Sequence, residues 1–256
     1  MDHLEETVIQ VAERPALLTY ADLADRLEHQ LLAPTLNEDQ VIDGCRMAWE
    51  MGVAACCVRP VDVDTAVRIL GNSPVKIGSV VGFPHGSSNT ATKLYEGRDL
   101  LRRGAVELSM VVNVGKLASR QFQHIETEIL QMADSCRQNN ATLKIIYECA
   151  ILTDEWKIIL SKILKRTETP VAVTSTGFGP GAPYTTEDLI LLRQILRDRA
   201  ELQASGVNTL DEALRLYDAG CDRIGTTVAE TILGEWKKRL AEQAKAAEAQ
   251  LKTSEV

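Results

Sequence analysis

Short apolar runs alternate along the chain with longer segments in which apolar residues recur every three or four positions. The short runs, rich in β-branched side chains, are typical of buried parallel strands, and the longer segments are typical of helices. Eight strand–helix repeats of this kind predict an α/β fold, a single (β/α)8 TIM barrel. An open doubly wound sheet would need fewer repeats and a glycine-rich fingerprint after its first strand, which the sequence lacks. The expected strands are 27–32, 54–58, 75–81, 106–113, 143–148, 171–174, 202–204 and 223–225.

The helices between these strands are bounded by ordinary start and stop signals. Gly52 and Gly104 follow the last periodic residue of two of them, where glycine commonly ends a helix. The expected helices are 20–27, 37–51, 61–70, 89–103, 117–140, 154–166, 186–199 and 210–219.

Two further helices are expected outside the eight repeats. Residues 1–13 carry apolar side chains at helical spacing among acids, which predicts an extra amphipathic helix ahead of the barrel. Residues 229–251 are charged and alanine-rich, which predicts a helix that continues past the barrel with an exposed far end. We therefore expect one domain over 1–256, divided into an N-terminal helical segment at 1–25, the barrel at 26–233 and a C-terminal helical tail at 234–256, frayed after 251.

Composition narrows the class of protein. With 45% hydrophobic and 25% charged residues, the chain is typical of a soluble enzyme. The net charge of −8, with no basic stripe, argues against nucleic acid or an anionic membrane as a partner. The six cysteines show neither CxxC nor zinc-like spacing, and the chain begins without a signal peptide. We expect reduced thiols, a cytoplasmic location, no metal and no cofactor.

The sixth expected strand continues into PVAVTSTGFGPG at 170–181. Its β-branched residues end in a glycine-rich loop with free backbone amides, as expected where a barrel strand reaches a site. Further motifs are CVRP at 57–60, VVGFP at 80–84, VNVG at 112–115, LKIIYE at 143–148, ASG at 204–206 and RIGT at 223–226. In this order, across 27–233, they resemble the deoxyribose-phosphate aldolase family. The resemblance implies a class I aldolase barrel that joins acetaldehyde to glyceraldehyde 3-phosphate.

The family's imine chemistry, by this resemblance, needs a lysine on the sixth strand, a second lysine on the seventh and an aspartate on the fourth. These positions hold Val173, Gln203 and Ser109. Valine has no nucleophile, glutamine has no titrating charge, and serine is not basic at neutral pH without a partner. We expect the usual Schiff-base chemistry to be lost or altered. The changes fit either drift in a copy that keeps only its fold or reuse of the barrel for another reaction or for binding.

Lys144 is the strongest remaining candidate nucleophile. Strand alternation directs it into the barrel together with Ile146 and Glu148. Glu107 and Glu201, inward by the same alternation, could pair with it, and a buried lysine must be paired or lose its charge. Lys144 is therefore either a structural ion-pair partner or a relocated Schiff-base residue.

Several other polar residues are expected near the carboxyl ends of the strands. Glu148 and His29 could serve there as acid and base, so the candidate catalytic residues are Lys144, Glu148 and His29. Cys57, His85 and Thr174 are expected to line the pocket. Cys56 and Cys57 are adjacent on one strand and so face opposite sides.

By this resemblance, the phosphate site of the family is better preserved than its catalytic centre. Gly177, Gly206, Thr226 and Thr227 stand where family members offer amides and hydroxyls to the phosphate. The plainer interpretation is that they are turn glycines and a helix cap. Val207, in place of a second glycine, is expected to crowd the phosphate.

Two hypotheses remain open from the sequence. The first is an aldehyde-lyase of altered chemistry that acts on a small phosphorylated aldehyde or sugar through Lys144, Glu148 or His29. The second is a non-catalytic barrel that binds a sugar phosphate or serves in an oligomer. That oligomer is either a homo-oligomer or a hetero-oligomer with an active paralogue.

Overall fold

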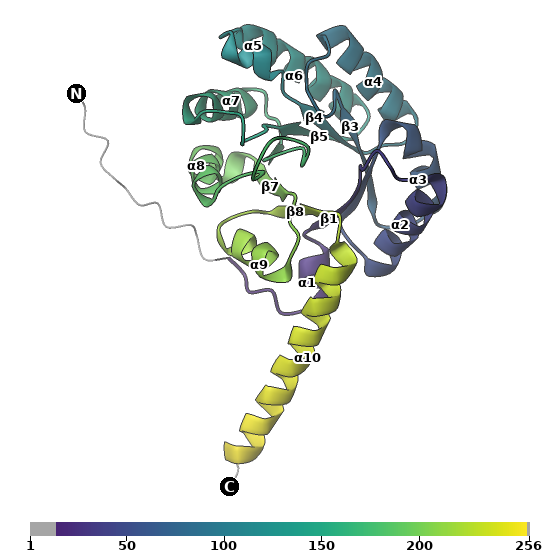
Figure 1. Ribbon diagram of the computed structural model, residues 1–256, viewed down its shortest axis with the longest axis vertical. Coiled ribbons are helices and arrows are strands. Elements are labelled where there is room, and N and C mark those ends of the chain that lie inside the picture. The colour runs from purple at the N-terminus through teal and green to yellow at the C-terminus, as the bar shows by residue number, and fades with distance from the viewer. Residues whose placement is uncertain (1–13, 255–256) are drawn as a thin grey trace, which may run out of the picture.

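The computed structural model describes residues 14–254, and in it the predicted barrel fold is confirmed. Eight parallel strands form one closed sheet in which each strand pairs with its neighbour and β8 pairs with β1 (Figure 1). The strands are β1 (Leu27–Leu31), β2 (Ala55–Val58), β3 (Lys76–Val81), β4 (Glu107–Val111), β5 (Thr142–Ile146), β6 (Val171–Val173), β7 (Glu201–Ser205) and β8 (Arg223–Thr226). The helix predicted over 1–13 lies outside the described residues.

Helices surround the barrel as an outer layer (Figure 1). They are α1 (Tyr20–Ala24), α2 (Glu38–Met51), α3 (Val63–Leu70), α4 (Thr90–Arg102), α5 (Val114–Ala118), α6 (Phe122–Gln138), α7 (Asp154–Arg166), α8 (Thr186–Leu196), α9 (Leu210–Asp218) and α10 (Ala229–Ser254), with 3-10 turns η1 (Pro60–Asp62) and η2 (Arg197–Arg199). Within the described residues no helix is long and apolar enough to cross a membrane.

Local sequence explains where these helices begin and end. The Asn37 side chain caps α2 by accepting a hydrogen bond from the backbone N–H of Gln40. The Gln40 side chain in turn accepts a hydrogen bond from the backbone N–H of Asn37. Gly52, with φ of 65°, ends the same helix in the left-handed conformation, as predicted.

The long helix predicted over 117–140 is wrong. The structure has two helices there, α5 and α6, which are separated by Arg120 in the left-handed conformation with φ of 56°. The helix predicted over 186–199 likewise ends at Leu196, because Arg197 has φ of 49°. Arginine is a good helix former, so neither break has a signal in the sequence.

Side-chain alternation divides the core into an outer and an inner part. The outer part fills the space between strands and helices and includes Cys56, while the inner part includes Cys57 with Leu32 and Val80. The predicted opposite orientations of the two cysteines are therefore confirmed. A second inner cluster consists of Val111, Ile146, Val171 and Val173, and Phe83 packs on both inner clusters.

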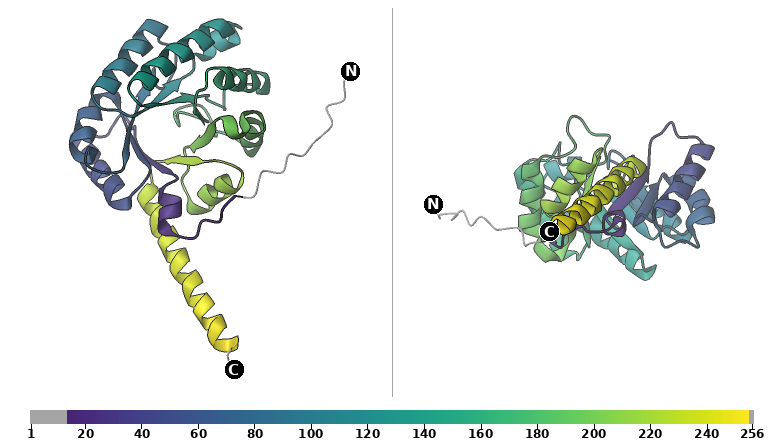
Figure 2. Two further views of the ribbon diagram at one scale, coloured as in Figure 1. Left: turned by 180° about the vertical axis from the view of Figure 1, so that it is seen from behind. Right: turned by 90° about the horizontal axis from the view of Figure 1, so that it is seen from below.

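The last helix, α10, projects away from the barrel, as Figure 2 shows from two sides. Its first half is anchored, since Trp236 is buried and donates from its indole N–H to the Thr19 carbonyl at 2.9 Å. Residues 241–247 are exposed, as predicted for the far end of this helix.

Candidate functional site

Lys144 lies at the centre of a charged network inside the barrel. Its side chain is fully buried, and its Nζ lies 2.5 Å from Glu28 Oε2 and 2.5 Å from Glu107 Oε2. It also donates to Gln203 Oε1 at 3.2 Å. The predicted pairing with Glu107 is confirmed, and Glu28 is a second, unpredicted carboxylate partner of Lys144.

Glu201 does not pair with Lys144, so that part of the prediction is wrong. It is the first residue of β7, at the amino end of the barrel, and its side chain is half exposed. There it meets Arg223 at 2.5 Å, and Arg223 in turn donates to Glu107 Oε1 at 2.8 Å. Strand alternation predicts which face of the strand Glu201 occupies, but it does not predict how far along the barrel axis the side chain lies.

The network keeps Lys144 charged. Burial alone would lower the pKa of this amine, but Glu28 and Glu107 favour its charged form and raise the pKa above the ordinary value. Burial likewise acts to raise the pKa of Glu107, and the cations of Lys144 and Arg223 outweigh it and lower that pKa to about 2. The amine therefore carries no free lone pair at neutral pH.

The three positions that the family resemblance marks as catalytic meet around one small cavity. Ser109, Val173 and Gln203 line it together with Phe83 and the side chains of the inner core. Its volume is about 10 Å³, roughly the space of one water molecule. Gln203 is tied into the charged network, because its Nε2 donates to Glu28 Oε1 at 2.8 Å.

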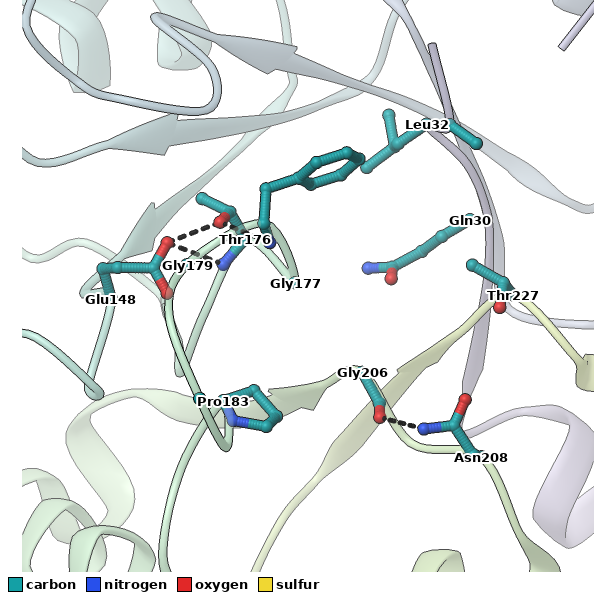
Figure 3. A pocket seen from close by; sticks show the side chains of 13 residues that line it. Gln30, Leu32, Glu148, Thr176, Gly177, Gly179, Pro183, Gly206, Asn208 and Thr227 are labelled. Carbon is teal, nitrogen blue, oxygen red and sulfur yellow. Dashed lines mark hydrogen bonds between the residues drawn. The ribbon is translucent and has the colours of Figure 1, made fainter. Parts of the chain in front are cut away.

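A larger cavity of about 330 Å³ opens at the carboxyl ends of the strands (Figure 3). We call it the mouth cavity. Four of the residues predicted to hold phosphate or perform catalysis at this end line it: Glu148, Gly177, Gly206 and Thr227. The other lining residues are Gln30, Leu32, Ala33, Thr176, Phe178, Gly179, Gly181, Pro183 and Asn208.

The Gly206 amide is engaged within the fold. It donates to the Gly225 carbonyl at 3.0 Å, and the Val207 amide donates to the same oxygen at 3.2 Å. Gly206 has φ of 93°, a conformation that side chains disfavour, so glycine is needed here for the backbone. The Val207 side chain is buried in the outer core.

Thr226 and Thr174 lie beneath the mouth cavity and line neither cavity. Both are fully buried. Thr226 Oγ1 accepts from the Val228 amide at 3.0 Å, just before α10, and Thr174 Oγ1 accepts from the Ser205 amide at 3.1 Å. The expected place of Thr174 in the pocket is therefore wrong, and both hydroxyls fix the backbone under the site.

Glu148 is the one acidic residue among those that line the mouth cavity. It follows β5 with φ of 61°, a conformation that costs a non-glycine residue on the order of 1 kcal/mol or more. Its Oε2 accepts from Thr176 Oγ1 at 2.5 Å and from the Thr176 amide at 3.3 Å. Its Oε1 is buried without a hydrogen-bond partner among the described residues.

The structure corrects the positions expected for the two histidines. His29 is buried on the face of β1 opposite Glu28 and Gln30, whose side chains meet inside the barrel. Burial lowers the pKa of His29 to about 4. Neither ring nitrogen has a partner among the described residues. His85 is exposed in the loop after β3 and lines neither cavity.

Cys57 faces inward and lines the small cavity. Burial raises the pKa of its thiol well above the ordinary value, and the charge of Glu28 adds to this, so the thiol stays protonated. All six cysteines are buried and free. In the part of the chain that the structure describes, no group of His, Cys, Asp or Glu residues could hold a metal ion.

Several residues of the site carried no clear signal in the sequence. Gln30 is two positions from Glu28 on one strand, so both side chains lie on one face, but nothing in the sequence indicates that Gln30 lines a ligand cavity. Phe178 packs edge-on against Phe83, with ring centroids 5.4 Å apart, where the mouth cavity meets the small cavity. Asn208 lies in a loop, where periodicity gives no orientation.

Comparison with known proteins gives one consistent result, although no family model matches the chain. A deoxyribose-phosphate aldolase from Caldanaerobacter subterraneus is 34% identical over 220 residues, which cover 85% of this chain and 95% of that protein. A deoxyribose-phosphate aldolase from Thermosynechococcus vestitus is 37% identical over 207 residues, which cover 80% of this chain and 93% of the relative.

Solved structures agree with the sequence comparison. The aldolase QR15 superposes with a TM-score of 0.81 at 30% identity, covering 85% of this chain and 97% of the other. A tetrameric deoxyribose phosphate aldolase from Aeropyrum pernix superposes with a TM-score of 0.80 at 26% identity, covering 86% and 93% of the two chains.

Proposed function

Since this chain belongs to the deoxyribose-phosphate aldolase family, we propose that it binds a small phosphorylated sugar or aldehyde in the mouth cavity without the family's imine chemistry. The state of Lys144 carries this proposal. An imine forms only when a neutral amine attacks a carbonyl, and Lys144 is buried between two carboxylates that favour its charged form.

The surroundings of Lys144 support the same proposal. No lysine is among the described residues that line either cavity. Val173 and Gln203, at the family's lysine positions, face the small cavity, whose volume of about 10 Å³ has no room for a substrate carbon chain. Relocated chemistry at Lys144 would require breaking both ion pairs and opening the inner core.

The mouth cavity supports ligand binding. Its volume of about 330 Å³ is within the lower range of small-molecule sites. Thr227 lines it directly ahead of α10, so a phosphate near Thr227 would meet the positive end of that helix. The relatives are named for a substrate of this class, deoxyribose phosphate.

Borohydride trapping combined with a binding measurement tests the proposal. We expect no reducible adduct with acetaldehyde or deoxyribose 5-phosphate and no aldol turnover, but saturable binding of deoxyribose 5-phosphate by calorimetry. The Thermosynechococcus relative serves as the reference for turnover. A covalent adduct on Lys144, located by peptide mass spectrometry and lost in Lys144→Met, would overturn the non-catalytic assignment. Absence of any sugar-phosphate binding would overturn the binding assignment.

We also propose that the chain forms a homo-oligomer, as its Aeropyrum relative forms a tetramer. Val61 in η1 and Tyr95 on α4 are large apolar side chains left 73% and 78% exposed. Light scattering of the purified chain should give a multiple of the 28.1 kDa subunit mass. A mass of one subunit at all concentrations would reject self-association and leave a hetero-oligomer with a lysine-bearing paralogue to test by mixing.

A further inference from the structure

Two aromatic rings meet between the mouth cavity and the small cavity. Phe178, in the loop after β6, lines the mouth cavity, and Phe83, after β3, lines the small cavity. The rings pack edge-on, with centroids 5.4 Å apart and planes at 83°. Since Gln30, Leu32 and Thr176 line both cavities, the ring pair lies where one cavity continues into the other.

The loop that carries Phe178 is held by few interactions. Residues 177–182 have no helix or strand, and all of them except Gly179 are exposed. Within the described chain they form no backbone–backbone hydrogen bond, and the Phe178 amide donates to Thr176 Oγ1 at 3.0 Å. The Phe178 side chain is 48% exposed although it contacts Phe83. Segments with few buried contacts and few hydrogen bonds open at a low cost in free energy.

Two glycines bracket the part of the loop that carries Phe178. Gly177 has φ of 78° and Gly181 has φ of 71°, and a Cβ built on either would meet nothing within 4 Å. Packing therefore requires neither glycine. Each supplies a backbone conformation that other residues adopt only at a cost, and glycine moves between conformations with the least steric restriction. The two positions are suited to act as hinges.

The loop in its present position leaves one polar atom unsatisfied. A Cβ on Gly179 would come within 2.8 Å of Glu148 Oε1, so the loop covers this oxygen. Oε1 is buried without a hydrogen-bond partner among the described residues, whereas Oε2 accepts from both donors of Thr176 (Figure 3). A buried carboxylate oxygen without a donor is unfavourable, and movement of Gly179 would let water reach it. Hydration of Glu148 thus favours an open loop, and the contact between the two rings favours a closed one.

We propose that Phe178 is a gate between the mouth cavity and the small cavity, which opens by rotation of the loop about Gly177 and Gly181. When the gate is closed, a molecule in the mouth cavity stops at the two rings. When it is open, the molecule reaches Ser109 and Gln203 in the small cavity. Phe178 therefore determines how deep a ligand enters the barrel. The proposal goes beyond the proposed function, because it concerns access to the interior by any small molecule.

Two neighbouring cysteines report on the gate. Cys57 lines the small cavity, whereas Cys56 belongs to the outer core, and both thiols are buried. The full chain is treated with methyl methanethiosulfonate, a small thiol reagent, and fragmentation of the labelled peptide gives the rate at each cysteine. Opening of the gate exposes Cys57 alone, whereas unfolding exposes both. The ratio of the Cys57 rate to the Cys56 rate therefore measures the gate.

Two variants should raise this ratio by different routes. In Phe178→Ala it should rise about threefold to tenfold, since an aromatic pair contributes that much to an equilibrium. Gly181→Ala should raise it while keeping both rings, because alanine disfavours the positive φ of the closed loop. Gly52→Ala is the matched control, since Gly52 has φ of 65° and a Cβ there also meets nothing within 4 Å. It should leave the ratio unchanged, and so should Ile190→Ala, which shortens an exposed residue of α8.

The outcomes decide the gate independently of ligand binding. A ratio that stays at the wild-type value in both loop variants overturns the proposal. A rise in Phe178→Ala alone overturns the hinge, because it assigns the opening to the missing ring, whereas a rise in Gly181→Ala supports the gate. A wild-type Cys57 rate equal to that of the urea-unfolded chain also overturns the proposal. The assay contains no sugar phosphate, so the gate and the proposed function can fail separately.

Discussion

Lys144 occupies a position where its loss would leave two carboxylates buried without their main counter-charge. We expect Lys144→Met to lower the free energy of unfolding by about 3–5 kcal/mol, because Glu28 and Glu107 remain in the dry interior. Urea unfolding followed by circular dichroism measures this loss. The control is Lys162→Met, at an exposed position of α7, which should change the stability by less than about 0.5 kcal/mol. Equal stability of the Lys144 variant and the wild type would contradict the assignment of a structural ion pair.

His29 makes stability depend on pH in a separate range. Its pKa is lowered by burial from 6.5 to about 4, so the unfolded chain binds a proton at higher pH than the folded chain does. The stabilisation is complete above pH 6.5 and is lost as the pH falls toward 4, by about 3 kcal/mol in all. The pKa of Glu107 is also lowered, from 4.5 to about 2, so its stabilisation is present above pH 4.5 and is lost only at lower pH.

Urea unfolding at pH 7 and pH 5 separates these contributions. The variant His29→Leu should lose most of the decrease in stability between the two pH values, whereas His85→Leu, at an exposed position, should retain it. An unchanged decrease in His29→Leu would show that another group titrates in this range.

At the scale of single elements, the break between α5 and α6 depends on one strained residue. Arg120 has φ of 56°, and its ion pair with Glu155, 3.5 Å long, is exposed on both sides. Exposed pairs contribute little, so Arg120→Gly should raise the free energy of unfolding by up to about 1 kcal/mol. Gln131→Gly, inside α6 at an exposed position, should lower it by about 1 kcal/mol. A loss of stability in both variants would mean that the loop depends on the arginine side chain.

The same elements mark what sequence could and could not predict. The strands and most helices can be predicted from periodicity, because the spacing of apolar residues shows which face of each element is buried. The Arg120 break could not be predicted, since arginine favours helix and its left-handed conformation between α5 and α6 has no signal in the sequence. Alternation predicted that Lys144 and Glu107 face inward. It could not predict that Glu28 reaches the same amine, because β1 lies four strands away from β5 in either direction around the closed sheet.

At the scale of the whole molecule, the barrel holds its charges and its cavity at different depths. Lys144 and its carboxylates fill the interior, the small cavity lies beside Ser109, Val173 and Gln203, and the mouth cavity opens above them. The small cavity and the mouth cavity share Gln30, Leu32 and Thr176 as lining residues. The three positions that the family resemblance marks as catalytic thus line one cavity, and this makes their restoration a test of the proposed loss of imine chemistry.

The triple variant Ser109→Asp, Val173→Lys and Gln203→Lys should recover measurable deoxyribose 5-phosphate cleavage. The three positions lie on β4, β6 and β7 around one cavity, so together they supply a nucleophile, a second cation that keeps it neutral and a proton carrier. Val173→Lys alone should stay inactive, because a single buried amine there lacks the second cation and the aspartate. Aldehyde release in a coupled assay and a borohydride-trapped adduct at position 173 measure the recovery. A folded triple variant with neither activity nor adduct would mean that the narrow inner cavity, and not these three side chains alone, excludes the reaction.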